Sequence, residues 1–191
     1  HWEYVIIGGG SAGCVLANRL SADPSKRVLL LEAGGWDGHP LIRIPAALAM
    51  MPQKFDWRFP GEPDPSRNDL PDDWSAGRVL GGGSSINMMC WVRGERSDFD
   101  EWRDGGCTGW GYDDVLPYFQ RAETYTDTPS PYRGTSGPVN VTKVKMQLEA
   151  LDDFLEAAVV AGHQKNDDYN GERQQGVALA QVNQRRGFRC N

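Results

Sequence analysis

Three glycines near the start of the chain, in the stretch IIGGGSAGC, have the spacing that dinucleotide-binding proteins use. Gly8, Gly10 and Gly13 satisfy G-x-G-x-x-G, in which the glycines permit a tight turn, a close backbone approach to a pyrophosphate, and close helix–strand packing. Glu32 ends the next apolar run, where a carboxylate accepts hydrogen bonds from ribose hydroxyls. The pattern predicts a bound dinucleotide, but it does not distinguish FAD from NAD.

A second glycine-rich stretch, AGRVLGGGSSINMMCWVRG, follows at Ala76–Gly94. Its three glycines, Gly81–Gly83, are also compatible with a flexible turn between domains. Alternatively, the following Ser84 and Ser85 cap a helix whose first-turn N–H groups bind an anion, with Asn87 reaching a planar ring system. FAD has such a ring to orient, whereas an NAD-dependent dehydrogenase would account for the first loop only. Two loops therefore favour FAD.

The elements that position these loops follow from apolar periodicity. The continuous apolar runs Tyr4–Ile7 and Val28–Leu31 predict strands buried on both faces of a parallel sheet. Apolar residues recur at helical spacing from Ala12 to Leu20, which completes a βαβ unit. The pattern is weak from Gly34 to Gly77. Further helices are predicted near Ser84–Val92, Ser97–Trp102, Asp113–Ala122 and Gln147–Ala161, with strand-like segments in GTSGPVNVTK and GVALAQVNQ.

Composition excludes several classes of protein. Apolar residues make up 39% and the net charge is −6, without a basic run that would neutralise nucleic-acid phosphates. No segment approaches the roughly twenty apolar residues that cross a bilayer, so no transmembrane segment is predicted. Nothing at the N-terminus reads as a secretory signal. The four cysteines, Cys14, Cys90, Cys107 and Cys190, show neither C-x-x-C pairing nor zinc-ligand spacing, which predicts reduced thiols in a cytoplasmic protein.

Several motifs together resemble one family. The segment GRVLGGGSSIN at Gly77–Asn87, followed by VRG at Val92–Gly94 and DFD at Asp98–Asp100, resembles the first signature of the glucose–methanol–choline (GMC) flavoprotein oxidoreductases. The opening YVIIGGGSAGCVLANRLSADPSKRVLLLEAG is similar to the N-termini of its bacterial alcohol and choline dehydrogenase branch. GWGYDDVLPYFQRAE, GTSGPVNV and DYNGERQQGVALAQVNQRRGFR resemble later segments in the same order. The resemblance therefore covers the whole chain.

The resemblance implies an α/β fold: a Rossmann-like FAD-binding domain over residues 1–133 and the beginning of an α+β substrate-binding domain over 134–191. It implies FAD as cofactor and oxidation of a small-molecule alcohol to an aldehyde by hydride transfer to the flavin. Some members attach FAD covalently through a histidine at the position of Ile86. Because an isoleucine cannot form that bond, non-covalent binding of FAD is expected here. The implied cofactor-binding residues are Gly8, Gly10, Ser11, Ala12, Gly13, Glu32, Ala33, Trp57, Arg78, Val79, Gly82, Gly83, Asn87, Met88, Met89 and Cys90.

No catalytic or metal-binding residue is predicted in this chain. The family's catalytic histidine and second signature lie further towards the C-terminus, and His39 and His163 fit ordinary surface histidines better than general bases. The turn at Asn166–Asn170 resembles a calcium loop, but Val177 stands where a carboxylate is needed. The chain is expected to be an N-terminal fragment that needs the remainder of the same enzyme or a complementary C-terminal chain. A same-fold FAD-containing lyase and a non-catalytic flavin-binding subunit are alternatives.

Overall fold

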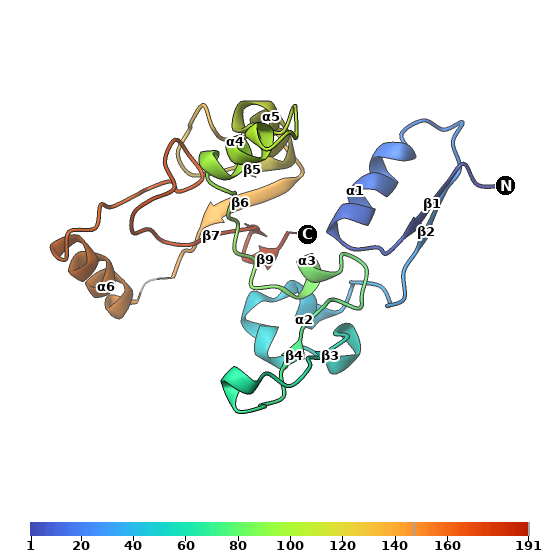
Figure 1. Ribbon diagram of the computed structural model, residues 1–191, viewed down its shortest axis with the longest axis horizontal. Coiled ribbons are helices and arrows are strands. Elements are labelled where there is room, and N and C mark those ends of the chain that lie inside the picture. Colours follow the sequence, from blue (N-terminus) through green and yellow to red (C-terminus); the bar gives the residue numbers. More distant parts are fainter. Residues whose placement is uncertain (147, 191) are drawn as a thin grey trace. The chain divides into compact units, whose positions relative to one another are not determined.

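The computed structural model describes residues 1–146 and 148–190, which form two compact units (Figure 1). The first unit consists of His1–Met88 with Gly187–Arg189, and the second consists of Met89–Arg186 with Cys190. The predicted division after residue 133 separates an FAD-binding part from a substrate-binding part. Because it is defined by the ligands that the two parts bind, it stays a prediction. Within the described residues, no helix has the length and apolar character needed to cross a membrane.

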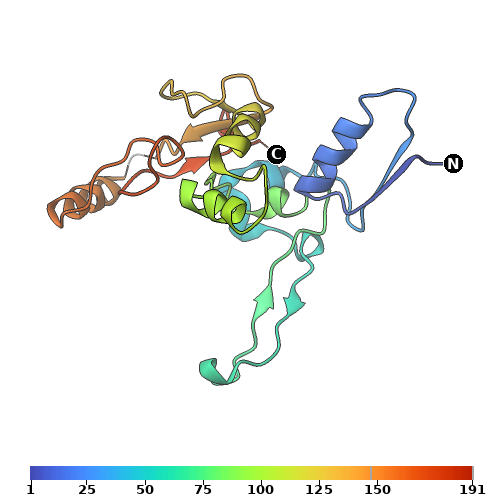
Figure 2. The ribbon, with the colours of Figure 1, turned by 45° about the horizontal axis from the view of Figure 1, so that its top comes forward.

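The first unit begins with the predicted βαβ arrangement. Strands β1 (Tyr4–Ile7) and β2 (Val28–Leu31) pair in parallel, with Ile7 opposite Leu31, and helix α1 (Ser11–Leu20) connects them. In both ribbon views α1 lies alongside this strand pair (Figures 1 and 2). Ile6 is buried, but the Ile7 side chain is 86% exposed. The prediction of strands buried on both faces is therefore wrong for this chain, because α1 covers one face only.

The weakly patterned region between the two glycine-rich stretches folds into six short elements, three of which begin at a proline. A proline fixes φ for the first helical turn and lacks only an N–H that would have no partner there. The β3–β4 hairpin forms an arm with η3 at its tip (Figure 2). These elements are α2 (Pro40–Arg43), η1 (Pro45–Met50), η2 (Gln53–Phe55), β3 (Phe59–Pro60), η3 (Pro65–Arg67) and β4 (Asp73–Trp74).

A small apolar core holds the first unit together beneath the glycine loops. Ile42 of α2, Phe55 of η2 and Val79 are buried against one another, and Ile86 of helix α3 (Gly83–Ile86) packs on them. Strand β9 (Phe188–Arg189) is the last element of this unit. The second glycine-rich stretch is thus anchored to the core on both sides of its three glycines, by Val79 before them and by Ile86 after them.

The second unit contains a three-stranded sheet of order β5-β6-β7, in which β5 and β6 are parallel and β6 and β7 antiparallel. Helices α4 and α5 pack through Phe99, whose ring lies 5.5 Å from that of Phe119 and 6.2 Å from that of Tyr112. The elements are α4 (Arg96–Asp104), α5 (Tyr112–Ala122), β5 (Glu123–Tyr125), β6 (Val139–Lys143), α6 (Glu149–Val160), β7 (Gln181–Val182) and β8 (Gln184–Arg185).

The helices predicted near Ser97, Asp113 and Leu148 are confirmed as α4, α5 and α6, although the first residue of the last prediction, Gln147, lies outside the described residues. The helix predicted over Ser84–Val92 is too long, since α3 ends at Ile86 and Met89 has the left-handed φ of 63°. The strand predicted in GVALAQVNQ is reduced to short pieces, because only Gln181 and Val182 pair with β6.

Candidate cofactor-binding site

The first glycine loop joins β1 to α1 through a turn that only glycine accommodates. Gly8 has φ 95°, and its N–H donates to the Leu31 carbonyl at 2.8 Å, so the loop remains attached to β2. A Cβ on Gly13 would lie 1.9 Å from the Gly8 carbonyl oxygen, so a glycine is required for α1 to begin this close to the strand. The first-turn N–H groups of α1 have no partner within the helix and carry its positive dipole end. Such a terminus favours an anion.

Glu32 holds the two ends of this loop region together. One carboxylate oxygen accepts a hydrogen bond from the Gly9 N–H at 2.7 Å, and the other accepts one from the Gly34 N–H at 2.8 Å. The side chain is partly buried, at the end of β2. Each carboxylate oxygen can accept a second hydrogen bond. Glu32 therefore fixes the glycine turn and still has acceptor capacity for a ligand hydroxyl.

The second glycine loop lies directly against the first. The Gly81 N–H donates to the Gly9 carbonyl at 2.7 Å, and the Leu80 N–H donates to the Gly35 carbonyl at 2.9 Å. A Cβ on Gly82 would come within 2.8 Å of the Gly10 Cα. The two loops, separated by some seventy residues of sequence, thus form one backbone surface.

The two serines after this loop do not cap α3 as predicted. Gly82 is the N-terminal cap residue and makes no side-chain cap. The Ser84 hydroxyl donates to the Gly81 carbonyl at 2.6 Å, and the Ser85 hydroxyl donates to the Leu80 carbonyl at 2.7 Å. Because both hydroxyls point back to carbonyls of the preceding turn, they tighten the loop instead of covering the N–H groups at the start of α3.

A hollow of about 550 Å³ opens where the two loops meet. The first loop, the end of β2 and the second loop each contribute to its wall. Its lining residues are Ile7, Gly8, Gly10, Leu31, Glu32, Ala33, Trp57, Gly77 and Gly82. This combination of a helix N-terminus, a carboxylate and glycine backbone suits a phosphate-containing ligand that carries ribose.

The comparison with known families decides what kind of protein has this site. The sequence profile of the GMC oxidoreductases matches residues 2–190. The chain belongs to the GMC oxidoreductase family. The predicted family is thereby confirmed, and it supports FAD as the cofactor, which the two glycine loops favoured.

The curated relatives of this GMC chain are about three times as long as it is. The oxygen-dependent choline dehydrogenase of Sinorhizobium fredii is 44% identical over 189 residues, which make up 98% of this chain and 34% of that protein. That of Vibrio vulnificus is 43% identical over 195 residues, covering 100% of this chain and 35% of that protein. The chain thus spans about a third of the length of the curated relatives it matches.

Solved structures agree with this assignment. Pyridoxine 4-oxidase from Mesorbium loti superposes with a TM-score of 0.92 at 35% identity, over 99% of this chain and 38% of that one. An FAD-dependent oxidoreductase from Chaetomium thermophilum gives a TM-score of 0.91 at 32% identity, over 100% of this chain and 35% of that one. The predicted α/β FAD-binding fold is confirmed by these likenesses.

Trp57 lines the hollow where the two loops meet, and Arg78, which lines a second hollow of the same unit, lies beside it. The Trp57 N–H donates to the Ala76 carbonyl at 2.8 Å, and the Arg78 N–H donates to the Phe55 carbonyl at 2.7 Å, so the two segments run side by side. The Arg78 guanidinium lies 4.8 Å from the centre of the Trp57 ring. The Trp57 side chain therefore lies at the wall of the hollow with a guanidinium close to its ring.

Asp56 fixes this pair of segments. One of its oxygens accepts from the Ala76 N–H at 2.8 Å, and the other accepts from the Ser75 hydroxyl at 2.7 Å. Burial opposes the charge on Asp56, but these hydrogen bonds outweigh it and hold its pKa below the ordinary range. Asp56, a residue that the sequence analysis did not single out, thus joins the segment of Trp57 to the segment of Arg78.

The remaining predicted site residues divide by location. Val79 is fully buried in the core beside Ile42, so any ligand contact at this position would come from its backbone. Ser11 and Ala12 form the first turn of α1, and Gly83, Asn87 and Met88 belong to α3 and the segment after it. Met89 and Cys90 fall in the second unit. The role of each of these residues stays a prediction.

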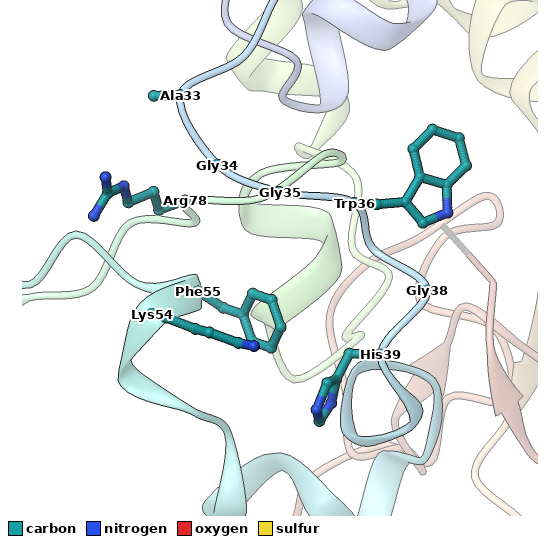
Figure 3. Close-up of a pocket in the computed structure, with 9 residues that line it drawn as sticks. All are labelled: Ala33, Gly34, Gly35, Trp36, Gly38, His39, Lys54, Phe55 and Arg78. Atoms are coloured by element: carbon teal, nitrogen blue, oxygen red, sulfur yellow. The ribbon is translucent and has the colours of Figure 1, made fainter.

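A second hollow of about 630 Å³ in the first unit contains one of the histidines (Figure 3). His39 accepts a hydrogen bond from the Leu41 N–H through Nδ1 at 3.3 Å, and its ring lies edge-on to Phe55 at 5.3 Å. The Lys54 ammonium lies 5.0 Å from the Phe55 ring centre. In Figure 3 the Arg78 and Trp36 side chains extend away from these three residues. His39 thus caps α2, which agrees with a structural histidine.

The second unit contains a buried ionic cluster that the sequence analysis missed. Glu123 is fully buried and accepts from Arg93 Nη2 at 2.7 Å and from Arg133 Nε at 2.6 Å. Arg133 also pairs with Asp168. Burial lowers the pKa of Arg93 and also opposes the charge on Arg133, but hydrogen bonds to Glu123 raise the pKa of Arg133 overall. The two arginines and two carboxylates balance in charge.

The predicted turn at Asn166–Asn170 supplies part of this cluster. The Asp168 N–H donates to the Asn166 side-chain oxygen at 2.9 Å, and the Asn170 N–H donates to the Asp168 carboxylate at 3.2 Å, as an Asx-rich turn requires. The Asn170 side-chain oxygen accepts from the Arg93 N–H at 2.7 Å. In the described part of the chain, no group of three or more His, Cys, Asp and Glu side chains is arranged to hold a metal ion.

Proposed function

We propose that this chain forms the FAD-binding part of an alcohol oxidoreductase of the GMC family, and that FAD is held without a covalent bond. The observation that carries the proposal is the meeting of the two glycine loops around one hollow, with Glu32 at its wall. Ile86, partly buried against the core, has no nucleophilic atom with which to bond a flavin.

The residues at the hollow fit the ADP half of FAD. A Cβ built on Gly8 or Gly10 meets no atom within 4 Å, so the loop leaves open space on the side where a ligand would approach. The N–H groups of Ser11 and Ala12 at the start of α1 would bind the pyrophosphate. Glu32 would accept hydrogen bonds from ribose hydroxyls while its bonds to Gly9 and Gly34 keep it in place.

The flavin half is assigned to the second loop, from Gly82 to the segment after Asn87. Bound FAD supplies a ring that accepts hydride from a carbinol carbon. The contribution of this chain is to bind and orient the cofactor, and we assign no general base among residues 1–146 and 148–190. Choline is the first substrate to test, because relatives that cover the chain are choline dehydrogenases. The four free thiols support a cytoplasmic location.

One pair of glycine substitutions tests the site. Gly10 has φ −74° and ψ −172°, which alanine also adopts, and nothing lies within 4 Å of an added Cβ. Gly10→Ala should therefore keep the melting temperature of the FAD-free protein while weakening FAD at least about tenfold, since the methyl group occupies the space of the pyrophosphate. The matched control is Gly35→Ala, where an added Cβ is equally free but lies outside this hollow.

The complete gene product is purified, stripped of flavin and titrated with FAD by fluorescence quenching, in parallel for both variants. Equal FAD dissociation constants for Gly10→Ala and the unsubstituted protein would contradict the placement of the pyrophosphate at this loop. Acid precipitation of the FAD-loaded protein should leave flavin in the supernatant, and flavin retained on the polypeptide would contradict non-covalent binding. Flavin bleaching by choline, or by another primary alcohol, distinguishes an oxidoreductase from a lyase or a non-catalytic flavin carrier.

A further inference from the structure

Arg189 of β9 is a buried arginine whose guanidinium is used almost completely. It is 6% exposed and donates four hydrogen bonds within the first unit. Nε donates to the Ile42 carbonyl at 2.9 Å, and Nη1 donates to the Ser84 carbonyl at 2.8 Å. Nη1 also donates to the side-chain oxygen of Asn87 at 2.7 Å, and Nη2 donates to the Asn87 carbonyl at 2.6 Å.

These bonds join three segments of the first unit, in addition to the apolar packing of Ile86 on the core. Ile42 belongs to the apolar core, Ser84 to α3, and Asn87 to the extended segment after it. A helix of four residues is too short to be stable by itself, and the carbonyls at its C-terminal end need donors. Arg189 supplies those donors and ties the end of α3 to the core.

The chemistry of arginine suits this position. The planar guanidinium presents its donors in a fixed fork, so it orients both oxygens of Asn87 at once, which a lysine ammonium on a flexible stem does less well. Burial lowers the pKa of Arg189, and within residues 1–146 and 148–190 its partners are neutral carbonyl oxygens. A buried cation is costly without such hydrogen bonds. The location of this buried cation beside the second glycine loop therefore indicates that its hydrogen bonds hold the loop in place.

We propose that Arg189 is a positioning residue of the FAD site: it fixes Asn87 and the end of the second glycine loop in the conformation that receives the flavin. This inference rests on the proposed function, because it assumes that the second loop faces FAD. Arg189 itself is buried behind the loop and acts through Asn87. Its effect should therefore appear in flavin binding and in the flavin environment as well as in folding.

The test compares Arg189→Ala and Arg189→Lys with Arg185→Ala, which removes an exposed arginine four positions earlier. In the complete gene product, Arg189→Ala should raise the FAD dissociation constant about 10- to 100-fold, because several hydrogen bonds that order Asn87 are lost together. Arg189→Lys should give an intermediate value, and Arg185→Ala should stay within about twofold of the unsubstituted protein. The visible circular dichroism of bound flavin should change in the Arg189 variants only.

Two further measurements separate positioning from a general loss of folding. Guanidinium ion at low millimolar concentration should restore part of the FAD affinity of Arg189→Ala and leave Arg185→Ala unchanged. The double variant Asn87→Ala/Arg189→Ala should bind FAD no more weakly than Arg189→Ala alone, since the arginine acts through the asparagine. If Arg189→Ala does not fold, the lysine variant carries the comparison.

The outcomes distinguish this inference from the function on which it rests. If the unsubstituted protein binds no FAD, the proposed function fails. If it binds FAD and both Arg189 variants bind equally well with an unchanged flavin spectrum, the function stands and the positioning role is overturned. A lower melting temperature of the FAD-free Arg189 variants, with unchanged FAD affinity, would likewise overturn it, because it would show a structural role only.

Discussion

Replacing Glu123 by glutamine removes a negative charge from the buried cluster of the second unit while leaving both arginines in place. The carboxylate accepts from Arg93 at 2.7 Å, from Arg133 at 2.6 Å and from the Trp91 indole N–H at 2.7 Å. A glutamine side chain has one acceptor oxygen, and its NH₂ group would face N–H donors. The variant therefore contains buried guanidinium groups that have lost their main counterion.

The expected cost follows from the burial of all the partners. The side chains of Glu123, Arg93 and Arg133 are at most 4% exposed, so solvent cannot replace the lost charge. Removing one partner of such a buried pair costs about 3–5 kcal/mol, and the remaining bond from Arg133 to Asp168 favours the lower end of this range. With an m-value of about 3 kcal/mol/M, since m rises with the size of the protein, a loss of about 3 kcal/mol lowers the urea midpoint by roughly 1 M.

The assay is urea unfolding of the complete gene product, followed by hydrogen exchange of peptides from β5 and the segment up to Arg133. Glu101→Gln, an exposed carboxylate on α4, is the matched control and should shift the midpoint by less than about 0.3 M. Adding Arg93→Met to Glu123→Gln should recover part of the loss, because one uncompensated cation is removed with its partner. Equal midpoints for the Glu123 and Glu101 variants would refute the reasoning.

Two other perturbations concern the first unit. Glu32→Ala should weaken the binding of FAD by about 1–3 kcal/mol. Glu32→Gln should weaken it by less, since an amide retains one acceptor oxygen for the N–H of Gly9 or Gly34. FAD titration curves that are unchanged in both variants would show that Glu32 is not part of the site. Because the folded pKa of Asp56 is depressed, its stabilisation is present above the ordinary value of 3.8 and is lost as pH falls through the lower folded value. A carboxyl NMR titration of Asp56, assigned with Asp56→Asn, checks this, and a midpoint at or above 3.8 would contradict it.

The first glycine loop was predictable because all of its determinants are local. A strand, a tight turn and a helix follow one another within the first twenty residues, and each is marked by apolar periodicity or by a glycine at a fixed spacing. Glu32 was predictable for the same reason, since it ends the next apolar run. What local patterning did not reveal is the second task of Glu32, which is to accept the N–H groups of Gly9 and Gly34.

The contacts that complete the site join residues far apart in the sequence, and periodicity carries no information about them. Arg189 meets Asn87 across about a hundred residues, and the motif around it shows only an arginine near the end of a strand-like segment. Glu123 directly follows an amphipathic helix, and an acidic residue at such a position is normally expected to be exposed to solvent. In the structure its side chain is fully buried. A signal did exist for its partner Arg93, which lies in a motif of the resembling family. Only the fold shows that this arginine meets a carboxylate.

Several glycines in and beside the two loops separate into two physical classes by what an added Cβ would meet, a distinction that the sequence alone does not show. In one class an added Cβ would overlap backbone atoms, so the glycine is required by the protein itself. These are Gly13 against Gly8, Gly34 against Arg78, Gly77 against Gly82, and Gly82 against Gly10. In the other class, which includes Gly10 and Gly83, the Cβ would enter open space. Substitutions in the first class should disturb the packing of the loops, whereas Gly10 and Gly83 are required only if a ligand approaches the backbone. The distinction explains why glycine content by itself is weak evidence for a cofactor, and why Gly10→Ala is a sharper test of FAD binding than Gly13→Ala.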